Sequence, residues 1–281
     1  MKERLTAQKL KSWKEQETPL VWLTAYDFSQ AEMAEQAGVD VILVGDSVGT
    51  TVMGYDSTLP VTMDDMVYHA RMVRRGAPKT MMVVDLPFLS YTRPDQALSN
   101  AGRFMQETLA DGVKLEGGRR VLDVVDALIA HDIPVIGHLG LTPQSVHAMG
   151  GYRVQARTQE TVRQLLDDAQ ALADHGIAAL VLEGIPDRVA AYVTEQIAIP
   201  TIGIGAGNGT DGQVLVFHDC LGLSSRYPKF AKPFADVRHA IVSGIEQYGS
   251  EVRTRAFPSD EHSYHITDKE WEAFWSREHS D

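Results

Sequence analysis

A chain of 281 residues with 44% hydrophobic residues is long enough to fold around a substantial core. Its formal net charge of −12 argues against nucleic acid or an anionic membrane as the main partner, because both require a positive face. The single cysteine, Cys220, excludes an intrachain disulfide. We see no signal-peptide pattern and no apolar run near the roughly 20 residues of a membrane span, so we expect a cytoplasmic protein.

Short apolar runs alternate with helix-like segments along the chain. The first predicted helix covers residues 5–17, and the first predicted strand covers residues 21–27. Most later strands are preceded by a glycine that can end the helix before them. The remaining predicted strands are 41–44, 81–85, 113–117, 134–138, 179–184, 200–205 and 213–219. The remaining predicted helices are 29–36, 62–76, 94–110, 119–131, 158–175, 187–197, about 234–248 and 268–277.

Eight strands that alternate with helices predict a parallel sheet, and most simply a closed (β/α)₈ barrel of the TIM type. An open doubly wound sheet is the alternative. Only about seven residues, 206–212, separate the last two strands, so we expect a single turn there instead of a full helix. We interpret residues 1–281 as one barrel domain with an N-terminal helix, in which residues 250–281 form a C-terminal extension.

Polar side chains stand at the carboxyl ends of nearly all predicted strands. In such barrels this edge carries the active site. A group of carboxylates there would attract a divalent cation, and all-oxygen ligation favours Mg²⁺. Helix capping is the alternative role for an isolated pair such as Asp46 and Ser47. The side chains at these ends are Asp27, Asp46 with Ser47, Asp85, Lys114 with Glu116, His138, Glu183, and His218 with Asp219.

Individual residues carry weaker signals. Glu183 ends an apolar run, so partial desolvation would strengthen it as a general base, although a salt-bridged structural role is the alternative. His138 and His218 are either metal ligands or hydrogen-bonded neighbours of the site. The glycine-rich segment 203–207 lies too late in the chain for a dinucleotide fingerprint and more simply predicts a tight turn or backbone approaching a ligand.

Several sequence blocks, in order along the chain, resemble the ketopantoate hydroxymethyltransferase family, also called 3-methyl-2-oxobutanoate hydroxymethyltransferases. The resemblance extends from about residue 5 to residue 248, and residues 258–263 resemble an extension of some members. The blocks are Gly45-Asp46-Ser47, Asp56-Ser57-Thr58-Leu59-Pro60-Val61-Thr62, Lys114-Leu115-Glu116-Gly117-Gly118, Gly140-Leu141-Thr142-Pro143-Gln144-Ser145 and Gly203-Ile204-Gly205-Ala206-Gly207.

The resemblance implies a (β/α)₈ barrel enzyme of pantothenate and coenzyme A biosynthesis. Such an enzyme transfers a hydroxymethyl group from 5,10-methylenetetrahydrofolate to 3-methyl-2-oxobutanoate through a Mg²⁺-stabilised enolate and yields 2-dehydropantoate (ketopantoate). It also implies a homo-oligomer, commonly a decamer, with small-molecule 2-oxoacid and folate partners. Mapped by motif, the metal ligands would be Asp46, Asp85 and Glu116, the last nearby or through water. The residues at the oxoacid would be Asp46, Ser47, Asp85 and Lys114, the base would be Glu183, and a possible supporting residue would be His138.

Two other functions are compatible with the same pattern. One is another Mg²⁺-enolate barrel enzyme of the phosphoenolpyruvate mutase and isocitrate lyase kind, which relies on a catalytic cysteine in a mobile loop. Cys220 lies beyond the last predicted strand, which disfavours that assignment. The other is a non-catalytic barrel that binds a small anion, which the retained acids and Glu183 argue against.

Overall fold

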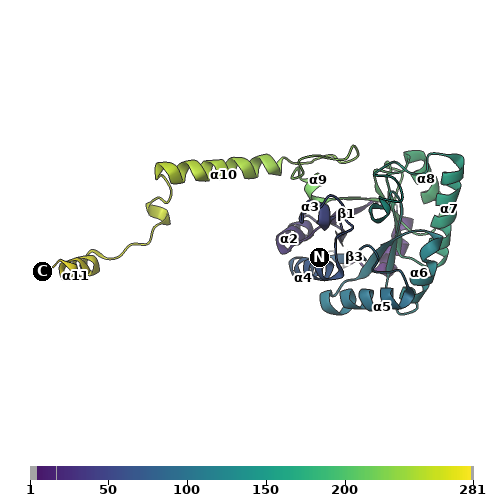
Figure 1. Ribbon diagram of the computed structural model, residues 1–281, viewed down its shortest axis with the longest axis horizontal. Helices are drawn as coiled ribbons and strands as arrows, with labels where there is room; N and C mark the ends of the chain where they lie inside the picture. Colours follow the sequence, from purple (N-terminus) through teal and green to yellow (C-terminus); the bar gives the residue numbers. More distant parts are fainter. Residues whose placement is uncertain (1–4, 17, 280–281) are drawn as a thin grey trace. The chain divides into compact units, whose positions relative to one another are not determined.

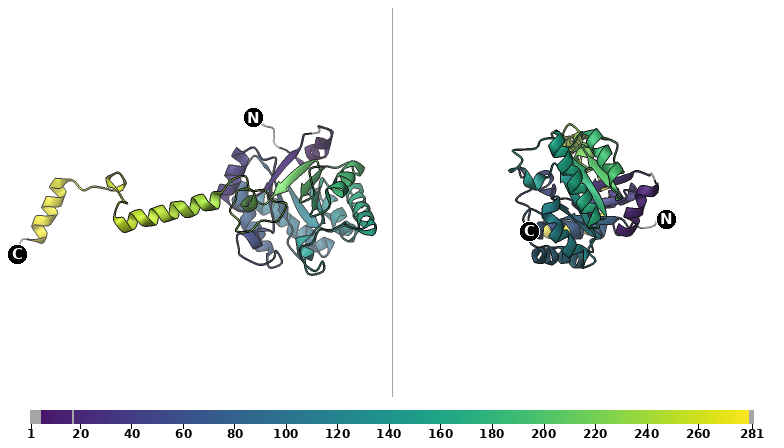
Figure 2. Two further views of the ribbon diagram at one scale, coloured as in Figure 1. Left: turned by 90° about the horizontal axis from the view of Figure 1, so that it is seen from above. Right: turned by 90° about the vertical axis from the view of Figure 1, so that its right-hand side faces the viewer.

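The computed structural model describes residues 5–16 and 18–279, and the chain divides into two compact units, residues 1–234 and residues 235–281. The first unit is a closed parallel barrel whose strands follow one another in sequence order, as predicted. Figure 2 shows β8 beside β1, where Trp22 is paired with Val214 and the barrel closes. The strands are β1 (Leu20–Thr24), β2 (Val41–Val44), β3 (Met81–Asp85), β4 (Gly112–Glu116), β5 (Val135–Gly140), β6 (Ala179–Glu183), β7 (Thr201–Ile204) and β8 (Gly212–Leu215).

Helices follow most of the strands and cover the outside of the barrel (Figure 1). The α-helices of this unit are α1 (Ala7–Trp13), α2 (Phe28–Gln36), α3 (Val48–Thr51), α4 (Met63–Gly76), α5 (Pro94–Arg103), α6 (Leu122–Ile129), α7 (Gln159–Asp174), α8 (Asp187–Gln196) and α9 (Phe217–Cys220). The 3₁₀ turns are η1 (Lys14–Gln16), η3 (Arg119–Val121) and η4 (Pro143–Ser145), and η2 (Phe104–Thr108) is a π-helical turn.

Local sequence explains where several helices begin. Thr62 and Asp65 form a reciprocal capping box at the start of α4, which satisfies two otherwise unpaired backbone N–H groups. The carboxylate of Asp27 accepts a hydrogen bond from the Gln30 backbone N–H at 2.8 Å and caps α2. The prediction that Asp27 ends the first strand was therefore wrong, because β1 ends at Thr24 and the acid serves the next helix.

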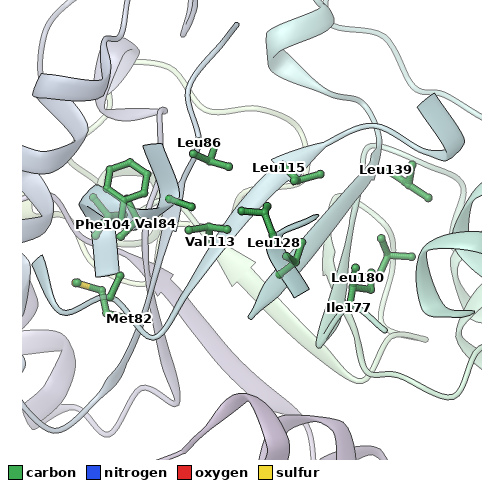
Figure 3. Close-up of a cluster of buried hydrophobic side chains, with 14 of the residues drawn as sticks. Met82, Val84, Leu86, Phe104, Val113, Leu115, Leu128, Leu139, Ile177 and Leu180 are labelled. Carbon is green, nitrogen blue, oxygen red and sulfur yellow. The ribbon is translucent and has the colours of Figure 1, made fainter. Parts of the chain in front are cut away.

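Successive side chains of each strand point alternately into and out of the barrel, and they form two separate apolar cores. Val41, Leu43, Met81 and Val83 belong to a cluster inside the barrel. Their neighbours along β2 and β3, including Met82 and Val84, belong to a larger cluster between the barrel and its helices (Figure 3). Since successive side chains of a strand point to opposite faces, this assignment also fixes which residues near the strand ends point into the barrel.

Two predicted boundaries were wrong, at the last strand and at α5. The connection between β7 and β8 has no helix, as predicted, and the expected single turn consists of bends over residues 205–211. The Asp211 carboxylate there accepts the Thr201 backbone N–H at 2.8 Å. Strand β8 ends at Leu215, so His218 and Asp219 lie on the short helix α9 and not at a strand end. The helix predicted over residues 94–110 changes to a π-helical turn at residue 104.

The second unit contains α10 (Val237–Thr254), the 3₁₀ turn η5 (Asp260–His262) and α11 (Asp268–Glu278). This unit starts at residue 235, earlier than residue 250, at which the sequence predicts that the extension begins. Helix α11 confirms the predicted terminal helix, and the Thr267 side chain accepts the Glu270 backbone N–H. Neither helix has a buried residue in the described part of the chain. None of the helices described, in either unit, has the length and apolar character needed to cross a membrane.

Candidate active site

The alternation that builds the two cores also directs the predicted site residues into the barrel. Asp85 continues the inward-pointing series of Met81 and Val83 on β3. On β4, Val113 and Leu115 belong to the outer core, so Lys114 and Glu116 point inward. The same phase applies to His138 after Ile136 on β5 and to Glu183 after Val181 on β6. The register places Asp85 beside Lys114 and Glu116 beside His138 on neighbouring strands. These residues line one cavity of about 360 Å³, together with Asp46 and Ser47.

Asp46 reaches the cavity in a different way, because it follows the end of β2. Its backbone N–H donates a hydrogen bond to Asp85 Oδ2 at 3.1 Å. At Gly45, the preceding residue, a Cβ atom would lie only 2.7 Å from Ser47 Oγ. A side chain at residue 45 would therefore displace the Ser47 hydroxyl, which also lies 2.8 Å from the Tyr26 hydroxyl. Glycine at this turn lets Asp46 and Ser47 face the same cavity.

Three buried carboxylates gather around one ammonium group. Lys114 Nζ lies 3.2 Å from Asp85 Oδ1, and both side chains are almost completely buried. Burial raises the pKa of Asp46 because it disfavours the charged carboxylate. Asp85 and Glu116 raise this pKa further, to about 8, because they disfavour another negative charge nearby. Burial likewise raises the pKa of Asp85, although Lys114 opposes this. Burial alone would lower the pKa of Lys114, but the nearby carboxylates raise it above its usual range, so the amine stays charged.

His138 connects the acidic cluster to Glu183. Its Nδ1 lies 3.3 Å from Glu116 Oε1 and its Nε2 lies 3.3 Å from Glu183 Oε2. Burial and Lys114 would lower the pKa of His138, but the two glutamates raise it to about 9. The raised pKa favours the charged imidazole, which can pair with both carboxylates, and Lys114 Nζ also lies 3.3 Å from its Nδ1. His138 lies next to the acids as a supporting residue, and Glu183, with 15% of its side chain exposed, keeps access to the cavity.

Sequence reasoning gave no role to Gln144, which the structure places at the centre of the polar network. Its backbone N–H donates to Glu116 Oε2 at 3.0 Å, and its Nε2 donates to Asp46 Oδ2 at 2.8 Å and to the Leu86 carbonyl at 3.0 Å. The Tyr91 hydroxyl donates to Gln144 Oε1 at 2.6 Å and thereby fixes which side of the amide faces Asp46. The only available signal was that Gln144 lies in the block Gly140–Ser145 of the family resemblance.

The carboxylate oxygens of the cavity suit a hard divalent cation that takes only a few of its ligands from the protein. Asp85 Oδ1 is buried and makes no hydrogen bond, since its contact with Lys114 lacks hydrogen-bond geometry. Across the described residues, no three His, Cys, Asp or Glu side chains form a ready-made metal cage. Mg²⁺ typically binds through one or two carboxylates and keeps several waters, which Asp46 and Asp85 can accommodate. Both oxygens of Glu116 already have protein neighbours, Gln144 and His138, which favours a contact through water.

The remaining polar candidates lie at the edge of the site or outside it. Asp219 lines the cavity from α9, whereas the ring of His218 packs near Tyr26 with 5.7 Å between centroids. Burial lowers the pKa of His218, so a neutral ring is favoured there. In the glycine-rich segment, Gly205 has a φ of +62° and Gly207 has a φ of +77°, which confirms the predicted tight turn. A Cβ at Gly207 would lie 2.5 Å from Asp187 Cβ, so that glycine serves packing.

Comparison with solved structures shows the same architecture at low sequence identity. A phosphonopyruvate hydrolase in complex with oxalate and Mg²⁺ aligns with a TM-score of 0.60 at 12% identity, covering 99% of this chain and 100% of that chain. A phosphoenolpyruvate phosphomutase from Streptomyces platensis subsp. rosaceus aligns with a TM-score of 0.61 at 14% identity, covering 98% of each. These likenesses show a shared barrel fold and nothing about the reaction.

Comparison of sequences is more specific. The family model for ketopantoate hydroxymethyltransferase matches residues 4–260. The 3-methyl-2-oxobutanoate hydroxymethyltransferase of Geobacillus kaustophilus is 50% identical over 259 residues, which cover 92% of this chain and 93% of that protein. The protein of the same name from Carboxydothermus hydrogenoformans is 51% identical over 264 residues, covering 93% of this chain and 96% of that protein. The chain therefore belongs to the ketopantoate hydroxymethyltransferase family.

Proposed function

We propose that this enzyme transfers a hydroxymethyl group from 5,10-methylenetetrahydrofolate to 3-methyl-2-oxobutanoate and yields 2-dehydropantoate for pantothenate and coenzyme A biosynthesis. The observation that carries the proposal is the convergence of Asp46, Asp85, Lys114 and Glu183 on one cavity. This set provides two carboxylates for a cation, one positive charge for an oxoacid, and one partly exposed base. Mg²⁺, when bound, supplies a Lewis acid that makes the C3 proton of the oxoacid easier to remove.

Each residue has a separate task in the proposed reaction. Lys114 and the Ser47 hydroxyl bind the oxygens of the 2-oxoacid, and the buried ammonium offsets the acidic surroundings. Asp46 and Asp85 hold the cation, and Glu116 contacts it through water. Glu183 accepts the C3 proton, while the positively charged His138 holds its carboxylate in place.

The bond changes balance with water as the second reactant. The C–H bond at C3 breaks and its proton passes to Glu183, which leaves an enolate. The enolate carbon forms a bond to the methylene carbon of the iminium form of the folate. Water then gives its hydroxyl to that carbon as the bond from carbon to the folate nitrogen breaks, and the second proton of the water goes to this nitrogen. The proton taken by Glu183 replaces the one that the other folate nitrogen needed to open the methylene bridge to the iminium. Tetrahydrofolate therefore leaves with both nitrogens protonated, and the new group ends as CH₂OH. A positioned base of this kind contributes about 10²–10⁴-fold to the rate.

The cysteine-dependent alternative has no support at the site. Cys220 is the only cysteine in the sequence and lies on α9, and burial raises the pKa of its thiol, which disfavours the reactive thiolate. The cytoplasmic location, which was expected from the sequence pattern, stays a prediction. The homo-oligomer, commonly a decamer, which the family resemblance implies, also stays a prediction.

The proposal is tested by two assays on the intact protein. With Mg²⁺, 5,10-methylenetetrahydrofolate and 3-methyl-2-oxobutanoate, we expect tetrahydrofolate and 2-dehydropantoate in equal amounts, and chelation of the metal should stop the reaction. In heavy water without folate, NMR should show Mg²⁺-dependent loss of the C3 proton signal. If the protein bound the oxoacid and Mg²⁺ but catalysed neither reaction, the non-catalytic anion-binding barrel would be the better description.

A further inference from the structure

The cavity is larger and more aromatic than the small oxoacid requires. The residues assigned to the oxoacid and the cation form its charged end, but the volume of about 360 Å³ falls in the range of pockets for much larger ligands. Two further lining residues are aromatic and remain partly open, since Tyr152 is 54% exposed and Phe230 is 38% exposed. The proposed reaction uses neither ring, so a second binding surface is available in the same cavity.

Tyr152 comes from the loop after β5, and Phe230, from the segment after α9, packs over the turn that follows β7. In the barrel order, β6 with Glu183 lies between β5 and β7. Tyr152 lies in the loop after β5, and Phe230 packs against Gly205 directly after β7. A Cβ at Gly205 would come within 2.6 Å of the Phe230 ring, so the glycine makes room for this aromatic side chain. This contact explains why glycine is needed at residue 205 in addition to its role in the tight turn.

Tyr152 lines the same cavity as Asp46, Glu116 and Glu183. Burial, followed by the charges of Asp46, Glu183 and Glu116, raises the pKa of the Tyr152 phenol. The phenol therefore stays neutral, and its ring presents an uncharged flat surface within the field of the acidic cluster. Thr58 also lines the cavity, is 3% exposed, and its hydroxyl has no hydrogen-bond partner within the described structure. Such a hydroxyl is available to a ligand.

We infer that Tyr152 and Phe230 form the stacking surface for the pterin head of the folate co-substrate, an inference that rests on the proposed function. The pterin is a flat heteroaromatic ring with N–H donors on its aminopyrimidine edge, and the carboxylate of Asp219 in the same cavity can accept from such donors. Stacking on rings that flank β6 would bring the methylene carbon to the face of the oxoacid from which Glu183 removes the proton. The donor and the base would then share one end of the pocket.

The inference predicts a selective loss of folate binding. Tyr152→Ala and Phe230→Ala should each raise the KM for 5,10-methylenetetrahydrofolate about tenfold, the loss expected for one stacked ring. The KM for the oxoacid and the folate-independent C3 exchange in heavy water should change less than about twofold. Tyr152→Phe should restore most of the folate affinity, since it keeps the ring. Tyr192→Ala on α8, an exposed tyrosine outside the cavity, is the matched control and should leave both substrates unaffected.

Four results separate the possible failures. An unchanged KM for the folate in both alanine variants would overturn the inference, and so would an equal rise in the KM for the oxoacid. If Phe230→Ala lost its folded structure in circular dichroism, Phe230→Leu would replace it, and a normal folate KM in that variant and in Tyr152→Ala would again contradict the stacking surface. A wild-type enzyme that exchanges the C3 proton but forms no product with this folate would instead contradict the proposed donor.

Discussion

The rim of the barrel has two different halves. Five consecutive strands, β2 to β6, have ionisable side chains at or near their carboxyl ends that line the cavity. The other three strands, β7, β8 and β1, contribute Ile204, Leu215 and Thr24 to the same cavity, and Phe230 packs over the turn after β7. The first half concentrates charge, whereas the strand residues of the second half, which we call the uncharged half, carry none; Asp219 reaches the cavity from α9 beyond them.

This difference follows from what each half must stabilise. Three buried carboxylates repel one another unless a cation and Lys114 compensate them, so the charged half is built for ligands that bring charge. The uncharged half offers apolar and aromatic surface, including Phe230, which suits the larger co-substrate. The comparison therefore predicts that substitutions of the ionisable side chains affect proton transfer and the binding of the metal and the oxoacid. Substitutions of Phe230, and of Tyr152 from the loop after β5, should instead affect the affinity for the folate.

Replacement of the base should give the largest effect. Glu183→Gln keeps the size of the side chain and removes its ability to accept a proton, so we expect C3 exchange to fall by about 10²–10⁴-fold. Binding of Mg²⁺ and of the oxoacid should persist. The measurement is the loss of the C3 proton signal by NMR in heavy water without folate, and the matched control is Glu195→Gln on the exposed side of α8. Exchange at the wild-type rate in Glu183→Gln would remove Glu183 from this role.

The two aspartates of the charged half should come next. Asp46→Ala and Asp85→Ala each remove one proposed ligand, and we expect the Kd for Mg²⁺ to rise about tenfold or more, since even indirect partners of a metal ligand matter by about 10–100-fold. Isothermal titration of metal-free protein measures this. Asp123→Asn, an exposed position on α6, controls for a change in net charge alone. Unchanged Mg²⁺ affinity in both alanine variants would show that the cation binds elsewhere.

Much of this arrangement could be predicted from sequence because it depends on short periodic patterns. Apolar runs that end in an acid predicted the strand and the side chain that lines the cavity together, as at Asp85 and Glu183. Where a single carboxylate stood alone the prediction was weaker, since Asp27 has the same context but caps α2. Strand ends and helix caps use the same residue types, and only the phase of the strand distinguishes them.

The residues that sequence reasoning missed lie outside the strands and α-helices. Tyr152 and Phe230 line the cavity from loops, and Gln144 on η4 acts on it through its hydrogen bond to Asp46. None of the three has a periodic context in the sequence. The amide of Gln144 lies beside Asp46, 98 positions away in the chain. No local pattern encodes such a contact, because it depends on how barrel closure brings the strand ends together.

Replacement of Gln144 should have an intermediate effect on stability and on Mg²⁺ binding. It tests how much the charged half depends on the hydrogen bonds that the neutral amide donates. Gln144→Leu leaves the Asp46 carboxylate, the Leu86 carbonyl and the Tyr91 hydroxyl without their amide partner. We expect a loss of about 1–3 kcal/mol in the free energy of unfolding of metal-free protein, measured in urea, together with weaker Mg²⁺ binding. The control is Gln170→Leu on the exposed face of α7. Equal stability of the two variants would argue that water replaces the Gln144 amide.

Tyr26 should give the smallest effect, because it acts from the uncharged half through one hydroxyl. Tyr26→Phe removes the 2.8 Å contact with Ser47 Oγ, and a loss of about 0.5–1.5 kcal/mol predicts a rise of about 2–10-fold in the KM for the oxoacid. Glu183-dependent exchange at saturating oxoacid should remain. A comparable rise in the KM for the folate would contradict the assignment of Ser47 to the oxoacid end.

Alkaline pH provides a second and independent test of Tyr26. Burial raises the pKa of Tyr26 to about 12, whereas an unfolded tyrosine titrates near pH 10, so above pH 10 the unfolded state loses its proton first. The unfolded chain then binds fewer protons than the native one, and stability falls as pH rises from 10 to 12. Between pH 9 and pH 11 this single group should cost wild type about 1 kcal/mol in urea unfolding. Tyr26→Phe should lack that part of the loss, whereas Tyr192→Phe, at an exposed position, should keep it. Parallel curves for wild type and Tyr26→Phe would mean that the phenol ionises as easily inside the barrel as in water.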